Sequence, residues 1–420
     1  MTKKINLLSN PKVDKLIFNN SNKIKTDNKM KIRNTSALKI KILHISHTDI
    51  RSDSRILKEL HAIEDLSGTE IIAFGIAKDF KGFYYNQENK FNIRLFSITS
   101  NKWRFLPKFI YVVLRGFEFI VRFLISGIKL KPKIIHCHDA SSLLPAFLVS
   151  IFCNSILIYD AHELESNKNG QTKLMSKLTL IMEKISWSKI NLLITVSPSI
   201  IDWYNEHLGA KKSLLILNSP TLVDYNQNIN KSNYFREKFN IPLDKKVFLY
   251  LGIMARGRGI DLYLDVFKRK ETEAHIVFMG SGEFVGKIEE TALTNSNIHY
   301  HPSVPHNEVV EISKSADIGL CMIEAVSLSD YFCLPNKLFE YAFSGLFVLS
   351  SNFPDLKQII EEYSLGTYSD LEPDALFKAI KLIENLELKN NNKTLYPLSW
   401  ANQAEKLKDA YSNILKLKNK

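Results

Sequence analysis

The sequence predicts an α/β protein with two Rossmann-like domains, and three observations support this. The chain has 420 residues, enough for two domains of ordinary size. Residues 39–74 and 246–267 each contain a short apolar run, a polar loop and an amphipathic segment, as expected where a strand leads into a helix. Residues 315–351 contain a complete strand–helix–strand unit with Gly345 after the helix. Units of this kind form parallel sheets, which bind ligands at the carboxyl ends of their strands.

Composition and charge exclude several classes of protein. Hydrophobic residues make up 45% and charged residues 24% of the chain, as in a globular protein in water. The net charge is +12, but residues 1–36 alone hold eight Lys and one Arg against two Asp. The remainder is only mildly basic and has no RNP, zinc-finger or helix-turn-helix pattern, so no nucleic-acid partner is expected. The four cysteines lack CxxC spacing, which favours a reducing cytosol over zinc or disulfides.

The N-terminal segment, residues 1–36, is rich in Lys, Asn and Ser. We expect it to be disordered or to add a short basic segment to the folded body. Contact with anionic lipid is an alternative, although most charged runs are simply solvated. Because no long apolar run follows the N-terminus, no cleavable signal is predicted and a cytoplasmic protein is expected.

The first domain is predicted over residues 37–220. It opens with a strand at 39–46, a helix at 54–66 and a strand at 71–74. This opening lacks the G-x-G-x-x-G turn, which argues against a dinucleotide-dependent dehydrogenase. The loop before the helix carries charged residues that suit helix capping and ion pairs: Arg51, Asp53 and Arg55.

Residues 103–133 are apolar, with a basic residue at every seventh position. The four basic residues are Lys108, Arg115, Arg122 and Lys129. Three charges within about 20 residues argue against a transmembrane helix. Two alternatives stay open: an amphipathic helix lying in a membrane surface, or a domain helix whose charged stripe faces water. In the first alternative four aromatic side chains would enter the lipid: Phe109, Phe117, Phe119 and Phe123.

Two later strands, 134–138 and 156–159, end in polar residues. Asp139 follows the first strand, and His162 and Glu163 follow the second. Carboxyl ends of parallel strands meet at one edge of a sheet, where a cleft is expected. A histidine between carboxylates in such a place suits a functional role, while a structural hydrogen bond is the alternative.

The second domain is predicted over residues 246–397, after a polar linker at 221–245 and before a last helix in residues 398–420. Its first strand leads into a glycine-rich loop and a helix, where the backbone and the helix N-terminus can approach a phosphate. Arginines add formal charge to the loop. The loop residues concerned are Gly252, Arg256, Gly257, Arg258 and Gly259.

The strand–helix–strand unit at 315–351 carries polar groups on the first turn of its helix. Pro335 suits the start of that helix, and Lys337 and Glu340 lie three residues apart on one face. The cation can meet a phosphate, and the carboxylate can accept from two neighbouring hydroxyls. The alternative is a solvated helix start with an incidental ion pair.

The segments ADIGL and LPNKLFEYAFSGLFVLSS closely resemble the C-terminal signature of retaining glycosyltransferases of the GT-B fold, the family-4 group. SDSRILKELHAIEDLSG, IIHCHD and ILIYDAHE are similar to N-terminal segments of the same family. The resemblance covers about residues 40–415. It implies two Rossmann-like domains facing a central cleft, with the acceptor on the first, a nucleotide-sugar donor on the second, and a final helix that crosses back.

The resemblance also implies roles for individual residues. The ribose of the donor falls on Glu340 and the diphosphate on Lys337 and Arg258. Many members have a second Glu eight residues before the ribose Glu; here that residue is Phe332, and Glu324 and Asp330 are the nearest carboxylates. The expected catalytic residues are His162, Arg258 and Lys337. The expected donor-binding residues are Gly252, Arg256, Arg258, Gly259, Asn336, Lys337 and Glu340. The expected acceptor-side residues are Asp139, Glu163 and Asp330.

The expected function is transfer of a sugar from a nucleotide-diphosphate sugar to a glycan or lipid-linked acceptor, with retention and without a metal or other cofactor. The abundance of Lys, Asn and Ile suggests an AT-rich bacterial genome, where such enzymes build surface polysaccharides. Residues 104–133 would then place the protein peripherally on the inner face of the cytoplasmic membrane. A nucleotide-sugar epimerase of the same fold, or a non-catalytic partner subunit, are the alternatives.

Overall fold

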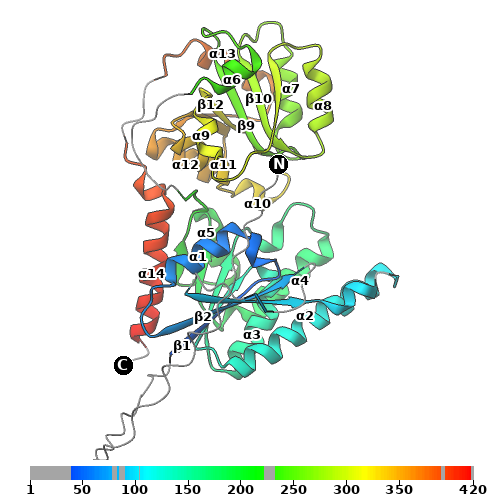
Figure 1. Cartoon of the computed structure of the whole chain (residues 1–420), viewed down its shortest axis with the longest axis vertical. Helices are drawn as coiled ribbons and strands as arrows, with labels where there is room; N and C mark the ends of the chain where they lie inside the picture. The colour runs from blue at the N-terminus through cyan, green and yellow to red at the C-terminus, as the bar shows by residue number, and fades with distance from the viewer. Residues whose placement is uncertain are drawn as a thin grey trace, which may run out of the picture. The chain divides into compact units, whose positions relative to one another are not determined.

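The computed structural model describes residues 39–77, 83–84, 90–103, 105–221, 232–388 and 393–417. Residues 39–420 form one compact unit that contains two β-sheets (Figure 1). The predicted N-terminal tail, residues 1–36, lies outside the described residues, as does most of the first half of the predicted linker at 221–245.

The first sheet has the strand order β3-β4-β2-β1-β5-β6-β7-β8. Only β3 runs antiparallel, at the edge. Ile and Leu dominate the parallel strands because helices cover both faces of the sheet. The strands are β1 (Ile40–Ile45), β2 (Thr69–Ala77), β3 (Phe83–Tyr84), β4 (Phe91–Ser97), β5 (Ile134–His138), β6 (Ile156–Ala161), β7 (Ile190–Thr195) and β8 (Ser213–Leu215).

Two groups of helices cover this sheet, because alternate residues of each strand point to opposite faces. On one face α1 and α14 pack side by side, although they come from opposite ends of the chain (Figure 1). The other face is covered by α2, α3, α4 and α5. The bounds are α1 (Ser54–Ile63), α2 (Lys108–Leu130), α3 (Leu143–Phe152), α4 (Lys173–Trp187), α5 (Pro198–Leu208) and α14 (Trp400–Leu417).

The second sheet is entirely parallel, in the order β11-β10-β9-β12-β13-β14. Its strands are β9 (Val247–Ile253), β10 (His275–Ser281), β11 (Ile298–Pro302), β12 (Ile318–Cys321), β13 (Phe347–Ser351) and β14 (Gly366–Ser369). One face packs against α7 (Ile260–Phe267), α8 (Val285–Ala292) and α13 (Pro373–Glu384). The other packs against α6 (Tyr234–Phe239), α9 (Val309–Ser313), α11 (Asn336–Phe343) and α12 (Pro354–Tyr363).

Short elements complete the described chain. The helix α10 (Leu328–Tyr331) lies in the loop between β12 and α11. Of the predicted linker, the part that is described folds onto the second sheet, because Phe235 of α6 is fully buried in its core. Single 3-10 turns are Ile50–Ser52, Thr99–Trp103, Ala140–Ser142, Glu165–Asn167 and Tyr396–Leu398.

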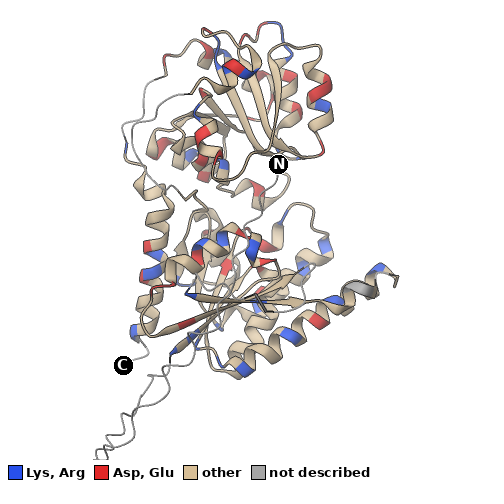
Figure 2. Ribbon diagram, viewed as in Figure 1, with Lys and Arg blue, Asp and Glu red and all other residues tan. Residues whose placement is uncertain are grey.

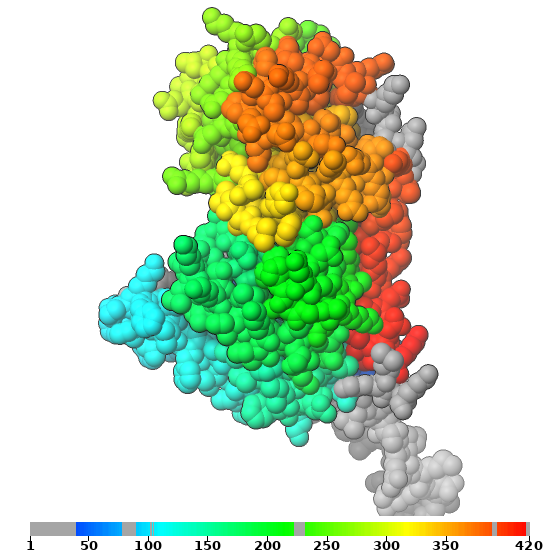
Figure 3. Space-filling model, turned by 180° about the vertical axis from the view of Figure 1, so that it is seen from behind, coloured from blue at the N-terminus to red at the C-terminus, as the bar shows by residue number. Residues whose placement is uncertain are grey.

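The helix predicted between residues 103 and 133 is α2, and its two halves differ. Phe119 and Phe123 are buried against the first sheet, whereas Phe109 and Phe117 are 77% and 63% exposed. The expectation that all four phenylalanines face lipid is therefore wrong for the two in the second half, because these two side chains pack into the hydrophobic core against the first sheet. Basic residues recur along α2 (Figure 2), and its first half projects from the surface (Figure 3, cyan). Of the helices that the structure describes, none combines the length and the apolar character needed to cross a bilayer.

Candidate active site

Two neighbouring cavities lie at the carboxyl ends of the strands of the second sheet. The first has a volume of about 570 Å³ and is lined mainly by the ends of β9 and β10 and by the first turn of α11. The second, of about 700 Å³, is lined by residues that follow strands of both sheets. The cavities are adjacent, because five residues line both: Ser54, Ile253, Arg258, Pro335 and Asn336.

The first turn of α11 presents an amine and a carboxylate to the first cavity. Pro335 occupies the N-cap, where the missing N–H costs nothing. Lys337 and Glu340 then line the cavity together, as the three-residue spacing predicts. The Lys337 ammonium lies 3.9 Å from the centre of the ring of Tyr250, the middle residue of β9. This cation–π contact holds the charge at the cavity wall.

Glu340 is a buried carboxylate with few partners. It is 7% exposed, and its nearest ion-pair partner, the His306 ring, is 3.9 Å away. Burial raises the pKa of Glu340 to about 7, against the opposing charges of Lys337 and Lys58. An ionised carboxylate that is short of donors in a cavity of this size is suited to accept hydroxyl groups from a ligand.

The glycine loop after β9 has two roles. Gly252 lines the first cavity with φ of 117°, and a Cβ there would lie 4.0 Å from the Lys337 side chain. Gly259 does not line either cavity. It caps α7 with φ of 71°, and a Cβ would come within 2.7 Å of the Met322 carbonyl oxygen. Its N–H donates to Glu324 Oε1 at 3.1 Å. Gly259, which was expected to bind the sugar donor, therefore supports the loop conformation and its close packing against Met322.

The loop arginines also differ. Arg258 lines both cavities, and its guanidinium lies 3.5 Å from the Asp330 carboxylate. Arg256 lines the second cavity alone, and its backbone N–H donates to Glu283. Of these two predicted residues, only Arg258 lies where the two cavities meet.

His162 enters the second cavity with both ring nitrogens directed at carboxylates. Nε2 lies 2.9 Å from Asp160 Oδ2, and Nδ1 lies 3.5 Å from Asp139 Oδ1. Burial lowers its pKa, but Asp139 and Asp160 outweigh this and raise it to about 9. His162 is therefore a fixed cation at neutral pH and not a free base. Asp139, expected on the acceptor side, stands behind it and lines neither cavity, whereas Glu163 and Asp330 line the second one.

The structure adds Lys168, which the sequence did not single out, and shows the contacts of Phe332 and Asp330. Lys168 lines the second cavity and forms an ion pair with Glu165 at 2.8 Å. Phe332, at the position of the missing glutamate, packs against the core of the first sheet, and its carbonyl oxygen accepts from Ser197 at 2.6 Å. Asp330, two residues before Phe332, faces Arg258. Chain spacing gave no signal for the contact between Phe332 and Ser197, because Ser197 follows a strand of the first sheet.

Comparison with known proteins finds a family model that matches the second domain. Residues 231–396 match the family model described as Glycosyl transferases group 1. The second domain is therefore similar to group 1 glycosyltransferases. All the residues that line the first cavity, apart from Ser54, fall within this matched glycosyltransferase segment. No curated protein sequence matches the chain.

Solved structures show the same fold over most of the chain. Sucrose-phosphate synthase from Thermosynechococcus elongatus is 15% identical with a TM-score of 0.63, covering 88% of this chain and 94% of that one. HepE from Anabaena, solved with UDP-glucose, is 10% identical with a TM-score of 0.64, covering 89% and 100%. The lipopolysaccharide outer core galactosyltransferase WaaB is 14% identical with a TM-score of 0.57, covering 88% and 94%. The predicted GT-B fold is confirmed, and domain and fold together support a nucleotide-sugar-dependent glycosyltransferase.

Proposed function

We propose that this glycosyltransferase moves a sugar from a nucleotide-diphosphate sugar to a glycan or lipid-linked acceptor, with retention of anomeric configuration. The observation that carries the proposal is the first cavity, where Lys337, Arg258 and the buried Glu340 converge on about 570 Å³. In this proposal Glu340 accepts from the ribose hydroxyls, and the two cations hold the diphosphate.

Transfer breaks the bond between the anomeric carbon and the diphosphate oxygen, so negative charge grows on the leaving group. Arg258 and Lys337 are fixed cations at the place where that charge would develop, and such groups stabilise a transition state without reorganising. Because they supply the positive charge that a divalent ion would bring, we propose that the diphosphate is bound without a metal. Asn336 adds a side-chain donor at the boundary of the two cavities.

We place the acceptor in the second cavity, which is lined by the first domain as well as by Asp330. Glu163 and Asp330 are carboxylates there that can orient an acceptor hydroxyl, and Lys168 and the cationic His162 add positive charge. We propose retention because the α11 segment resembles retaining enzymes. The anomeric configuration of the product, determined by NMR, tests it.

The donor and pathway are proposed from the neighbours. HepE was solved with UDP-glucose and WaaB acts on the lipopolysaccharide outer core, so we propose a UDP-sugar donor and bacterial surface polysaccharide synthesis. A lipid-linked acceptor would favour peripheral binding to the inner face of the cytoplasmic membrane. The exposed first half of α2 supports this, since its apolar side chains lie beside Lys108 and Arg115. The exposed face of α4 is similar, with Leu174, Leu178, Ile181 and Ile185 next to Lys173, Lys177 and Lys184.

A thermal-shift screen against nucleoside diphosphates, followed by transfer assays with the one that binds, tests the proposal. A bound nucleotide raises the melting temperature because it binds the folded state only. Product in which the sugar has moved to a second molecule supports transfer, whereas an isomerised nucleotide sugar indicates an epimerase. If no nucleoside diphosphate binds, a non-catalytic partner subunit is the better explanation, which Phe332 in place of a donor-facing glutamate would suit.

A further inference from the structure

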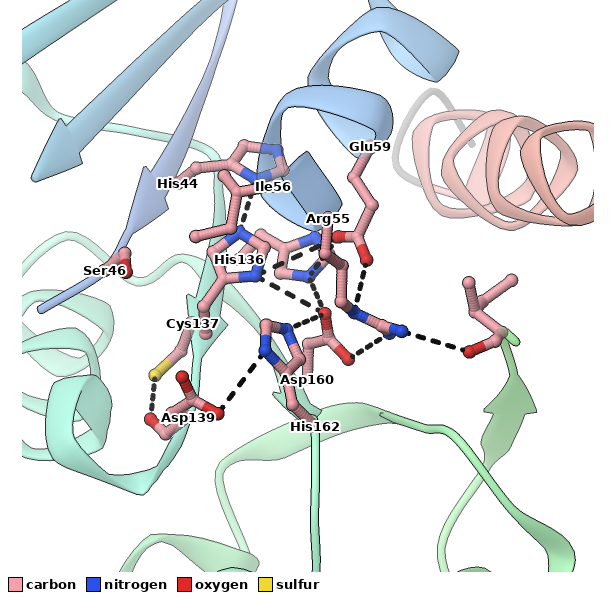
Figure 4. A network of polar contacts seen from close by, with 12 residues as sticks. His44, Ser46, Arg55, Ile56, Glu59, His136, Cys137, Asp139, Asp160 and His162 are labelled. Carbon is pink, nitrogen blue, oxygen red and sulfur yellow. Dashed lines mark hydrogen bonds and ion pairs between the residues drawn. The ribbon is translucent and has the colours of Figure 1, made fainter. Parts of the chain in front are cut away.

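A cluster of histidines and carboxylates is buried in the first domain, between the sheet and α1 (Figure 4). His44 on β1 is paired in register with His136 on the neighbouring β5, and His138 follows two residues later on the same face. Glu59 of α1 and Asp160 of β6 face them, and the side chains of all five are fully buried. None of the five lines either cavity of the active site.

The three imidazoles form a hydrogen-bonded chain that also includes Tyr411 of α14. His136 Nδ1 and the Tyr411 hydroxyl lie 2.8 Å apart, that hydroxyl and His44 Nε2 3.2 Å, and His44 Nδ1 and His138 Nε2 3.0 Å. Buried imidazoles favour the neutral form, with one hydrogen each. Three imidazoles and one phenol carry four hydrogens, and the three links use three of them. One hydrogen is left for two outer nitrogens, so at least one of these presents a bare lone pair.

Both outer nitrogens point at carboxylates. His136 Nε2 lies 3.5 Å from Glu59 Oε2 and 3.5 Å from Asp160 Oδ2, and His138 Nδ1 lies 3.9 Å and 3.4 Å from the same two oxygens. Neither nitrogen, nor Glu59 Oε2, has a hydrogen-bond partner within the described part of the chain. A lone pair against buried carboxylates is unfavourable unless a cation lies between them.

We propose that a divalent transition-metal ion of the zinc class binds here, held by His136 Nε2, His138 Nδ1, Glu59 Oε2 and Asp160 Oδ2. Zinc bonds to N and O of about 2.0–2.2 Å place the donor atoms of a tetrahedral site about 3.3–3.6 Å apart. The four distances between imidazole and carboxylate here are 3.4 to 3.9 Å, and all four donor atoms lie within 4.8 Å of one another. Small side-chain shifts are enough to complete the coordination.

The surroundings are those of a supported metal site. The second nitrogens of His136 and His138 bond to Tyr411 and His44, which fixes the orientation of both rings. Arg55 engages the other carboxylate oxygens, Glu59 Oε1 at 3.1 Å and Asp160 Oδ1 at 3.0 Å (Figure 4). The guanidinium is thus directed to the oxygens that the metal does not use. Asp160 Oδ2 also accepts a hydrogen bond from His162 Nε2 at 2.9 Å, so the ion would share this oxygen with the His162 ring.

The competing occupant of the lone-pair position is a single proton, held by Glu59 or by an imidazole. A metal ion needs both outer nitrogens without hydrogen. The hydrogen-bonded series of three imidazoles and Tyr411 must therefore release one proton or lose one of its three hydrogen bonds. A proton at the lone-pair position leaves this hydrogen-bonded series unchanged. The two occupants therefore differ in what can be measured: elemental content, cobalt spectra and proton release.

The role of the ion would be structural and separate from the diphosphate. The proposed ligands join α1, β5 and β6, and Tyr411 extends the network to α14. The inference does not depend on sugar transfer, so metal content can be measured whether or not the proposed activity is found.

The experiment is elemental analysis of the full chain, purified without metal-affinity chromatography, followed by Co²⁺ titration of protein treated with a chelator. We expect about one metal ion per chain, intense visible absorption typical of four-coordinate Co²⁺, and a higher melting temperature with the metal. His138→Asn and Glu59→Gln should lose at least ten-fold in affinity. The matched control is His299→Asn, which alters a stacked histidine pair on the second sheet and should keep the metal.

Three results would overturn the inference. One is wild-type protein with only trace metal that neither takes up Co²⁺ nor changes its melting temperature; the cluster then holds a proton. Another is metal retained in full by both cluster variants, which would locate it elsewhere. The third is a weak, six-coordinate Co²⁺ spectrum. If the variants fail to fold, the Co²⁺ titration of the wild-type protein decides alone.

Discussion

Replacing Glu340 with glutamine should weaken nucleotide binding and stabilise the protein at the same time. The two effects have one cause, the burial of a carboxylate that is 7% exposed and whose ion-pair partner within the described residues, the His306 ring, is 3.9 Å away. Burial raises its pKa to about 7, from a value of 4.5 in the unfolded chain. Between these two pH values the unfolded state loses its proton first, so the free energy of unfolding falls as pH rises. Above pH 7 the loss is complete, at roughly 3 kcal/mol.

Glutamine has the same shape but no charge to bury, so Glu340→Gln should be more stable than the wild type at pH 8 and nearly equal to it near pH 4.5. Its effect on binding has the opposite sign. Hydrogen bonds to a charged acceptor contribute about 1.5–3 kcal/mol each, and a neutral amide oxygen about half of that. We therefore expect roughly 10-fold weaker nucleotide binding for Glu340→Gln at pH 8, and a larger loss for Glu340→Ala.

Calorimetric titration with nucleoside diphosphates and thermal melts between pH 5 and 8.5 check both effects. Wild-type affinity should rise as pH increases through about 7, where the carboxylate ionises, while the glutamine variant should show little pH dependence. Glu290→Gln, at an exposed position on α8, is the matched control and should change neither property. An unchanged affinity for the Glu340→Gln variant, or a lower melting temperature at pH 8, would refute the reasoning.

Three further predictions test the rest of the site. Arg258→Ala should lower kcat, with a loss of about 2–4 kcal/mol of transition-state stabilisation, and Arg258→Lys should recover part of that loss. The surface variant Arg269→Ala should leave kcat unchanged. Equal rates for all these proteins would show that Arg258 does not bind the diphosphate. Initial transfer rates should survive EDTA added at the start of the assay and gain nothing from Mg²⁺, whereas loss with recovery on adding Mg²⁺ contradicts metal-free diphosphate binding. Anionic liposomes should float the protein at low salt, and Arg115→Glu with Phe117→Ser should weaken this while Leu382→Ser on α13 does not; protein that stays in the soluble fraction argues against the membrane face.

Local patterning was enough to predict the elements that form the proposed donor site. The strand at β12, the proline at the start of α11 and the three-residue spacing of Lys337 and Glu340 are all properties of one continuous segment. Helical periodicity alone places the two side chains on one face. The ends of parallel strands meet at one sheet edge, so the position of the cavity also followed from the sequence.

The tertiary structure decided what depends on partners distant in the chain. His162 became a cation because strand order places Asp139 and Asp160 on its two sides, and the two halves of α2 separated because only Phe119 and Phe123 meet the sheet. The buried cluster needs β1 beside β5 and the return of α14 from the end of the chain, 275 residues after His136. Periodicity fixes the face on which a side chain lies, but the energy of a buried charge depends on the groups opposite it, and only the packed fold brings those groups together.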